Sequence, residues 1–229
     1  MGVTQVVLVP GLGLGPESYA PTIQHLTMPY EIITLPGYGE RVQAGDDLHT
    51  EALAQRVLTH VTEPSVLVGH SASCQIVVAA ALAQPQLVKG LVLLGPTGDV
   101  GASDWVTLAE RWVRSAVWES PRLVPVLAPQ YARTGLVSMA QAMEVARRYD
   151  LAAAIRRLER PAVIVRCEHD NLCPAGWAQR LADLAGADAA GETHADVWTV
   201  PSGAHMPVLT HGEEVVTFIK RAAGVYNGQ

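Results

Sequence analysis

The sequence predicts an α/β fold, in which a mostly parallel sheet of about six strands has helices on both faces. Short apolar runs rich in β-branched residues alternate with segments of helical pattern, as in right-handed βαβ units. The runs show almost no alternation of apolar and polar residues, which is typical of strands covered on both faces. The predicted strands are Val6–Val9, Glu31–Leu35, Ser65–Val68, Leu91–Leu94, Ala162–Cys167 and Val197–Val200.

Helical segments connect the strands and follow the last one. Pro85 ends the segment after the third strand, because proline lacks the N–H that would continue a helix. The predicted helices are Ser18–Leu26, Thr50–Val61, Ser71–Gln84, Ala175–Leu184 and His211–Ala223.

Between the fourth and fifth strands, the segment 97–160 has helical patterns only. Apolar residues at i, i+3 and i+4 over Trp105–Val117 predict an amphipathic helix. Ser138–Gln141 has the pattern of a capping box, which predicts a second long helix that Pro161 ends. Prolines predict a broken, shorter piece between the two helices: Pro121, Pro125 and Pro129. The predicted division is a core of 1–96 and 161–229 with a helical cap at 97–160.

Length and composition exclude several classes of protein. The 229 residues fit one domain, and no apolar run is long enough to span a bilayer. The net charge of −6 and the scattered basic residues do not favour nucleic acid or anionic membranes. The N-terminus has no signal-peptide pattern, and the three cysteines lack metal-ligand spacing. We therefore expect a cytoplasmic protein with no metal; its oligomeric state is left open.

A sharp turn is predicted where the third strand meets its helix, in the sequence Gly-His-Ser-Ala-Ser. A nucleophile elbow has the pattern G-x-S-x-G, because the tight turn that exposes the serine leaves no room for neighbouring side chains. Gly69 provides one small position, and Ser73 replaces the second glycine. Ser71 is thus either a nucleophile or a cap of the following helix.

A glycine-rich loop, Val9–Pro16, follows the first strand. A dinucleotide fingerprint would need glycine in place of Pro16 and an acid after the second strand, where the sequence is Thr34–Gly37. We therefore expect no nucleotide cofactor. The loop could instead aim backbone N–H groups near Leu12 at an oxyanion, or it could simply be a tight turn.

Two further candidates follow predicted strands. Asp170 comes after the fifth strand, and His205 comes after the sixth in a glycine-containing turn. Sites in open α/β sheets lie at the carboxyl ends of the strands, although a loop acid is more often merely solvated. Ser71, Asp170 and His205 occur in the order Ser–Asp–His and can meet above one sheet edge.

With these motifs, the chain resembles the α/β-hydrolase superfamily over essentially its whole length. Leu35–Gly39 looks like the family's P-G-h-G turn, Asp170 with Pro174 like its acid loop, and Gly203–His205 like its base turn. The chain begins at what would be the family's third strand. The resemblance therefore implies six parallel strands without the two N-terminal ones, and a cap at the long helical insertion.

The sequence departs from the family pattern at two positions. Ser73 replaces the elbow glycine, and Pro10 replaces the histidine usual before the oxyanion-loop glycine. Neither change removes a proton-transfer group. Asp99, which follows the fourth strand, is a rival for the acid, because some relatives carry it one strand earlier.

The resemblance implies a serine hydrolase with no cofactor. Ser71 would be the nucleophile, His205 the base and Asp170 the acid that holds the imidazole tautomer. Backbone N–H groups of Leu12 and Ala72 would form the oxyanion hole.

The predicted cap is rich in aromatic and methionine side chains. Most of them would form the cap's own core, but together they indicate an apolar roof and a small, largely apolar ester or thioester substrate. The candidate substrate-binding residues are Trp105, Trp112, Tyr131 and Met206. The fold also allows carbon–carbon bond cleavage, lactone formation, lyase chemistry or binding without turnover.

Overall fold

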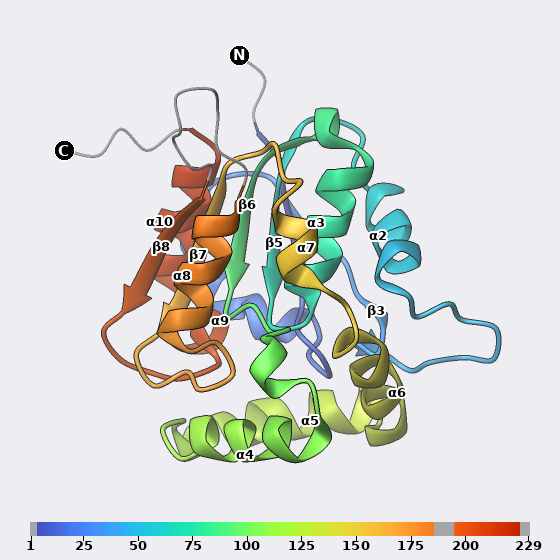
Figure 1. Ribbon diagram of the computed structural model, residues 1–229, viewed down its shortest axis with the longest axis vertical. Helices are drawn as coiled ribbons and strands as arrows, with labels where there is room; N and C mark the ends of the chain where they lie inside the picture. The colour runs from blue at the N-terminus through green and yellow to red at the C-terminus, as the bar shows by residue number, and fades with distance from the viewer. Residues whose placement is uncertain (1–3, 186–194, 225–229) are drawn as a thin grey trace.

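A parallel six-stranded sheet forms the centre of the computed structural model, which describes residues 4–185 and 195–224 (Figure 1). The strand order is β2-β1-β5-β6-β7-β8, and every pair is parallel. The strands are β1 (Val6–Val9), β2 (Tyr30–Ile32), β5 (Ser65–His70), β6 (Val88–Leu94), β7 (Ala162–Cys167) and β8 (Ala195–Val200). The predicted fold class is confirmed.

Helices cover both faces of the sheet and create two cores. Alternate residues of each strand point to opposite faces: Val7 packs in one core, and its neighbours Val6 and Leu8 pack in the other. The first core is covered by α2 (Thr50–Leu58), α3 (Ser73–Ala83), α7 (Leu151–Ile155) and α8 (Ala175–Leu184). The second is covered by α1 (Ala20–Ile23) and α10 (Gly212–Ala222), with α9 (Pro207–Thr210) beside α1.

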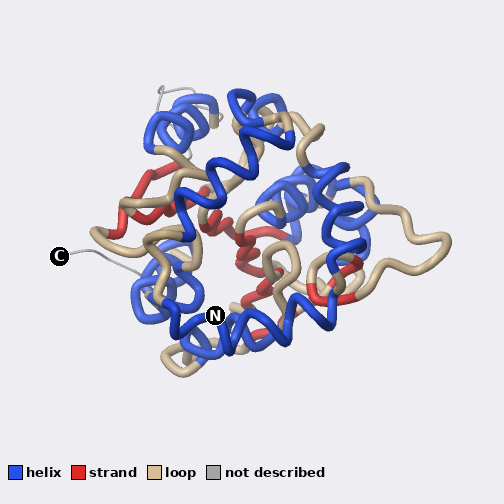
Figure 2. Tube along the Cα trace, turned by 90° about the horizontal axis from the view of Figure 1, so that it is seen from below, coloured by secondary structure: helices blue, strands red, loops and turns tan. Residues whose placement is uncertain are grey.

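Three further helices lie across the carboxyl ends of the strands, at the bottom of Figure 1. They are α4 (Trp105–Ala116), α5 (Val124–Thr134) and α6 (Leu136–Ala146). Figure 2, seen from this side, shows helices around the ends of the strands. The short helix α7, which follows them in the chain, packs instead against α3 on the sheet.

The predicted second strand, Glu31–Leu35, is too long. The chain leaves the sheet after Ile32, and β3 (Leu35–Pro36) pairs with β4 (Gly39–Glu40) in a separate turn. Gly37 and Gly39 both have positive φ, which turns the chain back on itself and ends the run.

The predicted helix Ser18–Leu26 is shorter and interrupted. A 3₁₀ turn (Pro16–Tyr19) precedes α1. Pro21 lacks the N–H that would continue the 3₁₀ turn into a longer α-helix. The predicted helix Ser71–Gln84 begins only at Ser73, because Ser71 has a φ of 59°, which no α-helix accommodates.

The predicted capping box at Ser138 is wrong. Helix α6 begins at Leu136 after Gly135, and the Ser138 hydroxyl accepts a hydrogen bond from the Val42 N–H at 3.0 Å. The helix ends at Ala146, so the predicted long helix is two helices. Ser138 therefore makes a tertiary hydrogen bond in place of the predicted helix cap, and no local sequence pattern reveals that contact.

The segment between α4 and α6 is less interrupted than predicted. Pro121 opens a 3₁₀ turn (Pro121–Leu123), and α5 follows it directly. Pro125 lies in the first turn of α5, where its missing N–H costs nothing, and Pro129 lies inside the helix.

Among the described residues, no helix is both long and apolar enough to cross a membrane.

Candidate active site

The turn between β5 and α3 places Ser71 in a strained backbone conformation. Its φ of 59° is the one positive value at a non-glycine residue in 4–185 and 195–224. A Cβ at Gly69 would lie 2.8 Å from the backbone N of Cys74, so no side chain fits there. Ser71 thus occupies a sharp strand-to-helix turn of the kind that exposes a nucleophile.

The Ser73 side chain stabilises the turn with hydrogen bonds. Its Oγ accepts a hydrogen bond from the His70 N–H at 2.8 Å. The same hydroxyl can donate its hydrogen to the carbonyl of Val9 at 2.8 Å or of His70 at 2.9 Å. The side chain is fully buried, and it ties the elbow to the end of β1. Here a serine holds the turn where the family pattern has glycine.

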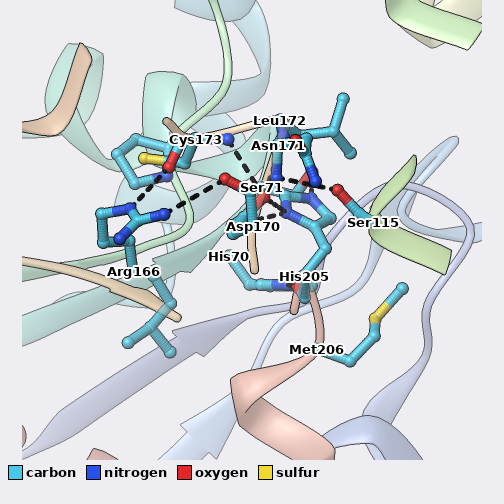
Figure 3. A network of polar contacts seen from close by, with 12 residues as sticks. His70, Ser71, Ser115, Arg166, Asp170, Asn171, Leu172, Cys173, His205 and Met206 are labelled. Carbon is cyan, nitrogen blue, oxygen red and sulfur yellow. Dashed lines mark hydrogen bonds and ion pairs between the residues drawn. The ribbon is translucent and has the colours of Figure 1, made fainter. Parts of the chain in front are cut away.

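Ser71, His205 and Asp170 form a chain of hydrogen bonds at the carboxyl ends of β5, β8 and β7 (Figure 3). His205 Nε2 lies 2.8 Å from Ser71 Oγ, and His205 Nδ1 lies 3.0 Å from Asp170 Oδ2. All three residues are buried. Asp99 instead pairs with Arg111 at 2.6 Å and accepts from the Gly101 N–H.

The electrostatics of Asp170 and His205 favour an ionised carboxylate beside a protonated imidazole. Burial alone would raise the pKa of Asp170, but His205 and the N–H groups of Cys173 and Leu172 hold that pKa below its usual value. Burial alone would lower the pKa of His205, yet the charge and hydrogen bond of Asp170 raise it. Asp170 therefore stabilises a protonated His205.

Arg166 supports the acid loop from inside the protein. Its buried guanidinium donates to the carbonyl of Cys173 at 2.9 Å and to that of Glu168 at 3.0 Å. The loop that carries Asp170 is thus held at both ends. The sequence marks Arg166 only as a charge inside an apolar strand, so its role was not predicted.

His70 contacts the backbone of His205 and makes no side-chain hydrogen bond to Ser71. Its Nε2–H donates to the backbone carbonyl of His205 at 2.7 Å. Burial and the neighbouring His205 lower the pKa of His70 to about 3, so the ring stays neutral. The contact spans 135 positions of sequence, so no local signal predicted it.

The glycine-rich loop leaves a donor free beside Ser71. The N–H groups of Gly13 and Leu14 donate to the carbonyls of Gly37 and Gly11. In the described part of the chain, no acceptor receives the N–H of Leu12 or that of Ala72. Leu12 lines the same cavity as Ser71, and Ala72 is the next residue in the chain, so these two unused donors are candidates for binding a developing oxyanion.

The end of α4 and the turn that follows it contact the two loops that carry Asp170 and His205. Ser115 Oγ accepts from the N–H of Asn171, next to Asp170, at 2.9 Å. Glu119 Oε1 accepts from the N–H of Met206, next to His205, at 2.9 Å. Trp118 stacks on His169 with the ring centroids 3.8 Å apart. We call Ser115, Trp118 and Glu119 the α4 clasp; nothing in their sequence spacing predicted it.

A cavity of about 340 Å³ opens above Ser71, and we call it the serine-side cavity. The four predicted substrate-binding residues and Leu12 all line it. Met139 and Met143, two of the cap methionines expected in the apolar roof, also line it. Sequence reasoning missed other lining residues: Leu14, His70, Thr97, Leu108, Ala109, Ala140 and Leu172. The cavity is almost entirely apolar apart from Ser71, Thr97, the Tyr131 hydroxyl and the two histidines. It can hold an apolar group next to a reacting carbonyl.

Comparison with known proteins agrees with this architecture. The model of the alpha/beta hydrolase family matches residues 6–218, so the chain belongs to that family. It is accordingly an enzyme of the hydrolase class. The pimeloyl-[acyl-carrier protein] methyl ester esterase of Xanthomonas axonopodis pv. citri is 27% identical over 94% of this chain and 93% of that protein.

Solved structures show the same fold at lower sequence identity. A hydrolase from Oleispira antarctica superposes with a TM-score of 0.77 and 15% identity, covering 96% of this chain and 92% of its own. The enol-lactonase from Burkholderia xenovorans LB400 has a TM-score of 0.74 and 17% identity, with 98% and 92% covered.

Proposed function

We propose that the chain hydrolyses small, largely apolar carboxylic esters or thioesters, with Ser71 as nucleophile, His205 as base and Asp170 as acid. The observation that carries this proposal is the 2.8 Å contact between Ser71 Oγ and His205 Nε2 at a residue held at positive φ. The esterase names of the relatives support ester substrates.

In the proposed mechanism, His205 takes the hydroxyl proton as Ser71 Oγ attacks the substrate carbonyl. Asp170 stabilises the imidazolium, and the N–H groups of Leu12 and Ala72 bind the oxyanion, each worth about 10²–10³ in rate. His205 then gives the proton to the leaving oxygen, and water releases the acyl group by the same steps.

We further propose that 97–160 form a cap over a core of 1–96 and 161–229. The apolar lining supports a largely apolar small molecule as substrate. The residues assigned to substrate binding are Trp105, Trp112, Tyr131 and Met206. The three cysteines are buried and unpaired, which supports a reducing, cytoplasmic compartment.

Hydrolysis of a panel of short esters by Ser71→Ala tests the proposal. Loss of the nucleophile should lower kcat by about 10⁴-fold or more. Ser103→Ala, at an exposed serine that lines neither the cavity beside Ser71 nor one beside His205, is the matched control and should hydrolyse the panel at the wild-type rate. Unchanged activity in Ser71→Ala would contradict the mechanism, and a folded wild-type protein that hydrolyses no ester would favour binding without turnover.

A further inference from the structure

A second cavity of about 400 Å³ adjoins His205, and we call it the base-side cavity. It shares four lining residues with the serine-side cavity: Trp112, Tyr131, His205 and Met206. The remaining lining residues come from the end of α4, from α5 and from the turn between them: Ser115, Ala116, Glu119, Ser120, Pro121, Leu123, Val124, Leu127 and Ala128. The two cavities therefore meet at the base.

The two cavities differ in which part of the reaction they face. Ser71 and Leu12 line the serine-side cavity and do not line the other. In ester hydrolysis the acyl carbon binds Ser71 Oγ, whereas the alcohol oxygen receives its proton from His205 Nε2. A cavity that His205 lines without the nucleophile thus lies where the alcohol portion must be.

We propose that the base-side cavity binds the alcohol portion of the ester, and that this portion is bulky and uncharged. This inference rests on the proposed function and narrows its substrate class. A water molecule takes about 30 Å³ in the liquid, and a methoxy group has only two heavy atoms. The methoxy group of a methyl ester would therefore leave most of this cavity of about 400 Å³ unfilled. Apolar surface there is buried only by a larger group.

The charge of the lining argues for an uncharged alcohol. Glu119 is the one acidic or basic side chain besides His205 among the described residues that line the base-side cavity. Its Oε2 is buried without a hydrogen-bond partner, and burial raises its pKa. An anionic group would lie beside this carboxyl without a lysine or arginine to compensate it. An alcohol that carries a carboxylate or phosphate close to its oxygen therefore fits this cavity poorly.

The proposed step needs no reactant beyond the ester and water. The Ser71 Oγ–acyl carbon bond forms, the acyl carbon–alkoxy oxygen bond breaks, and the hydroxyl proton reaches the alkoxy oxygen through His205. The alcohol then leaves the base-side cavity. Water adds its oxygen to the acyl carbon and gives a proton to His205. The acyl carbon–Oγ bond breaks, Oγ receives that proton from His205, and the carboxylic acid leaves.

A matched pair of substitutions tests the assignment. Leu127 lines only the base-side cavity and Leu108 only the serine-side cavity, and both are half-buried on neighbouring helices. Leu127→Trp and Leu108→Trp add the same bulk to each. The substrates are methyl butanoate, benzyl butanoate, 4-carboxybenzyl butanoate and methyl 3-phenylpropanoate.

Wild-type protein should hydrolyse benzyl butanoate with a kcat/KM about tenfold or more above that for methyl butanoate, and 4-carboxybenzyl butanoate well below benzyl butanoate. Leu127→Trp should lower the benzyl-to-methyl ratio about tenfold. Leu108→Trp should instead lower the ratio of methyl 3-phenylpropanoate to methyl butanoate. A reversed pattern, no preference for the benzyl ester, or equal hydrolysis of the carboxybenzyl ester would overturn the assignment.

Labelling of Ser71 by a small fluorophosphonate separates this failure from failure of the proposed function. If both variants and the wild type form the adduct but show none of these preferences, only the assignment of the cavity is wrong. If the folded wild type neither forms the adduct nor hydrolyses any ester, the proposed function is wrong and this inference falls with it.

Discussion

The side chains at the carboxyl edge of the sheet are more deeply buried than those of the helices that lie across it. Ser71, Asp170 and His205 are each less than a tenth exposed and are held by hydrogen bonds from several elements. On α4, by contrast, Trp112 is 50% exposed and Val113 is 55% exposed. Under the proposed function, we expect the chemistry, which needs fixed distances, to depend on the buried sheet edge and substrate recognition to depend on the more exposed helices.

The α4 clasp joins these two regions. It links residues next to the acid and the base to a helix whose outer face is largely exposed. Substitutions at the sheet edge should therefore abolish catalysis, whereas substitutions in the helices should tune it.

Asp170→Asn should lower kcat by about 10⁴-fold, because an amide no longer holds the His205 tautomer or stabilises its charge. Asp99→Asn is the matched control, because Asp99 pairs with Arg111 rather than with the base. Steady-state hydrolysis of one ester by both variants is the measurement. A larger loss of kcat in Asp99→Asn would mean that Asp99, after β6, is the catalytic acid instead of Asp170.

Ser73→Ala should destabilise the fold by about 1–3 kcal/mol, because the buried His70 N–H loses its acceptor and the Val9 carbonyl loses a donor. Urea unfolding gives the change in free energy. Ser103→Ala, at the exposed position used above, should change stability by less than about 0.5 kcal/mol. Equal stability of the two variants would mean that Ser73 merely fills space at the elbow.

Ser115→Ala should lower kcat by about three- to tenfold with little change in KM, because the Asn171 N–H beside the acid loses its acceptor. Val113→Ala, on the exposed face of the same helix, is the control and should behave as wild type. A fall in stability without a fall in the kcat of the folded protein would make the clasp purely structural.

The pH profile of kcat/KM should show the smallest change. Asp170 raises the pKa of His205 above 6.5 despite burial, so activity should rise with pH through a midpoint above that value. Glu119 also raises this pKa, so Glu119→Gln should move the midpoint to lower pH. His70 contributes no step, since its pKa lies near 3. A midpoint below 6.5 in the wild type would contradict this electrostatic account.

The fold was largely predictable from sequence, because burial on both faces leaves a strong local signal. The predicted bounds of β1 and β7 agree with the structure residue for residue. The failure at Ser138 has another cause. Ser138 has the right local pattern for a cap but bonds to Val42, and such a distant partner leaves no trace in the neighbouring sequence.

Part of the candidate site could be predicted from the sequence, and part of it could not. Ser71 and its two partners follow strands, so their meeting could be predicted from topology alone. His70 and the α4 clasp could not, because each acts through a backbone group brought close only by the folded chain. The base-side cavity was missed for the same reason, since its lining combines the end of α4, α5 and the base loop.

The central claim is that the Ser71 hydroxyl is activated by His205. Brief treatment with a small fluorophosphonate, followed by intact mass measurement, tests it most directly, with Ser71→Ala as the control. The account predicts one adduct per chain in the wild type and none in Ser71→Ala. An unmodified wild-type protein, or an adduct that persists in Ser71→Ala, would contradict it.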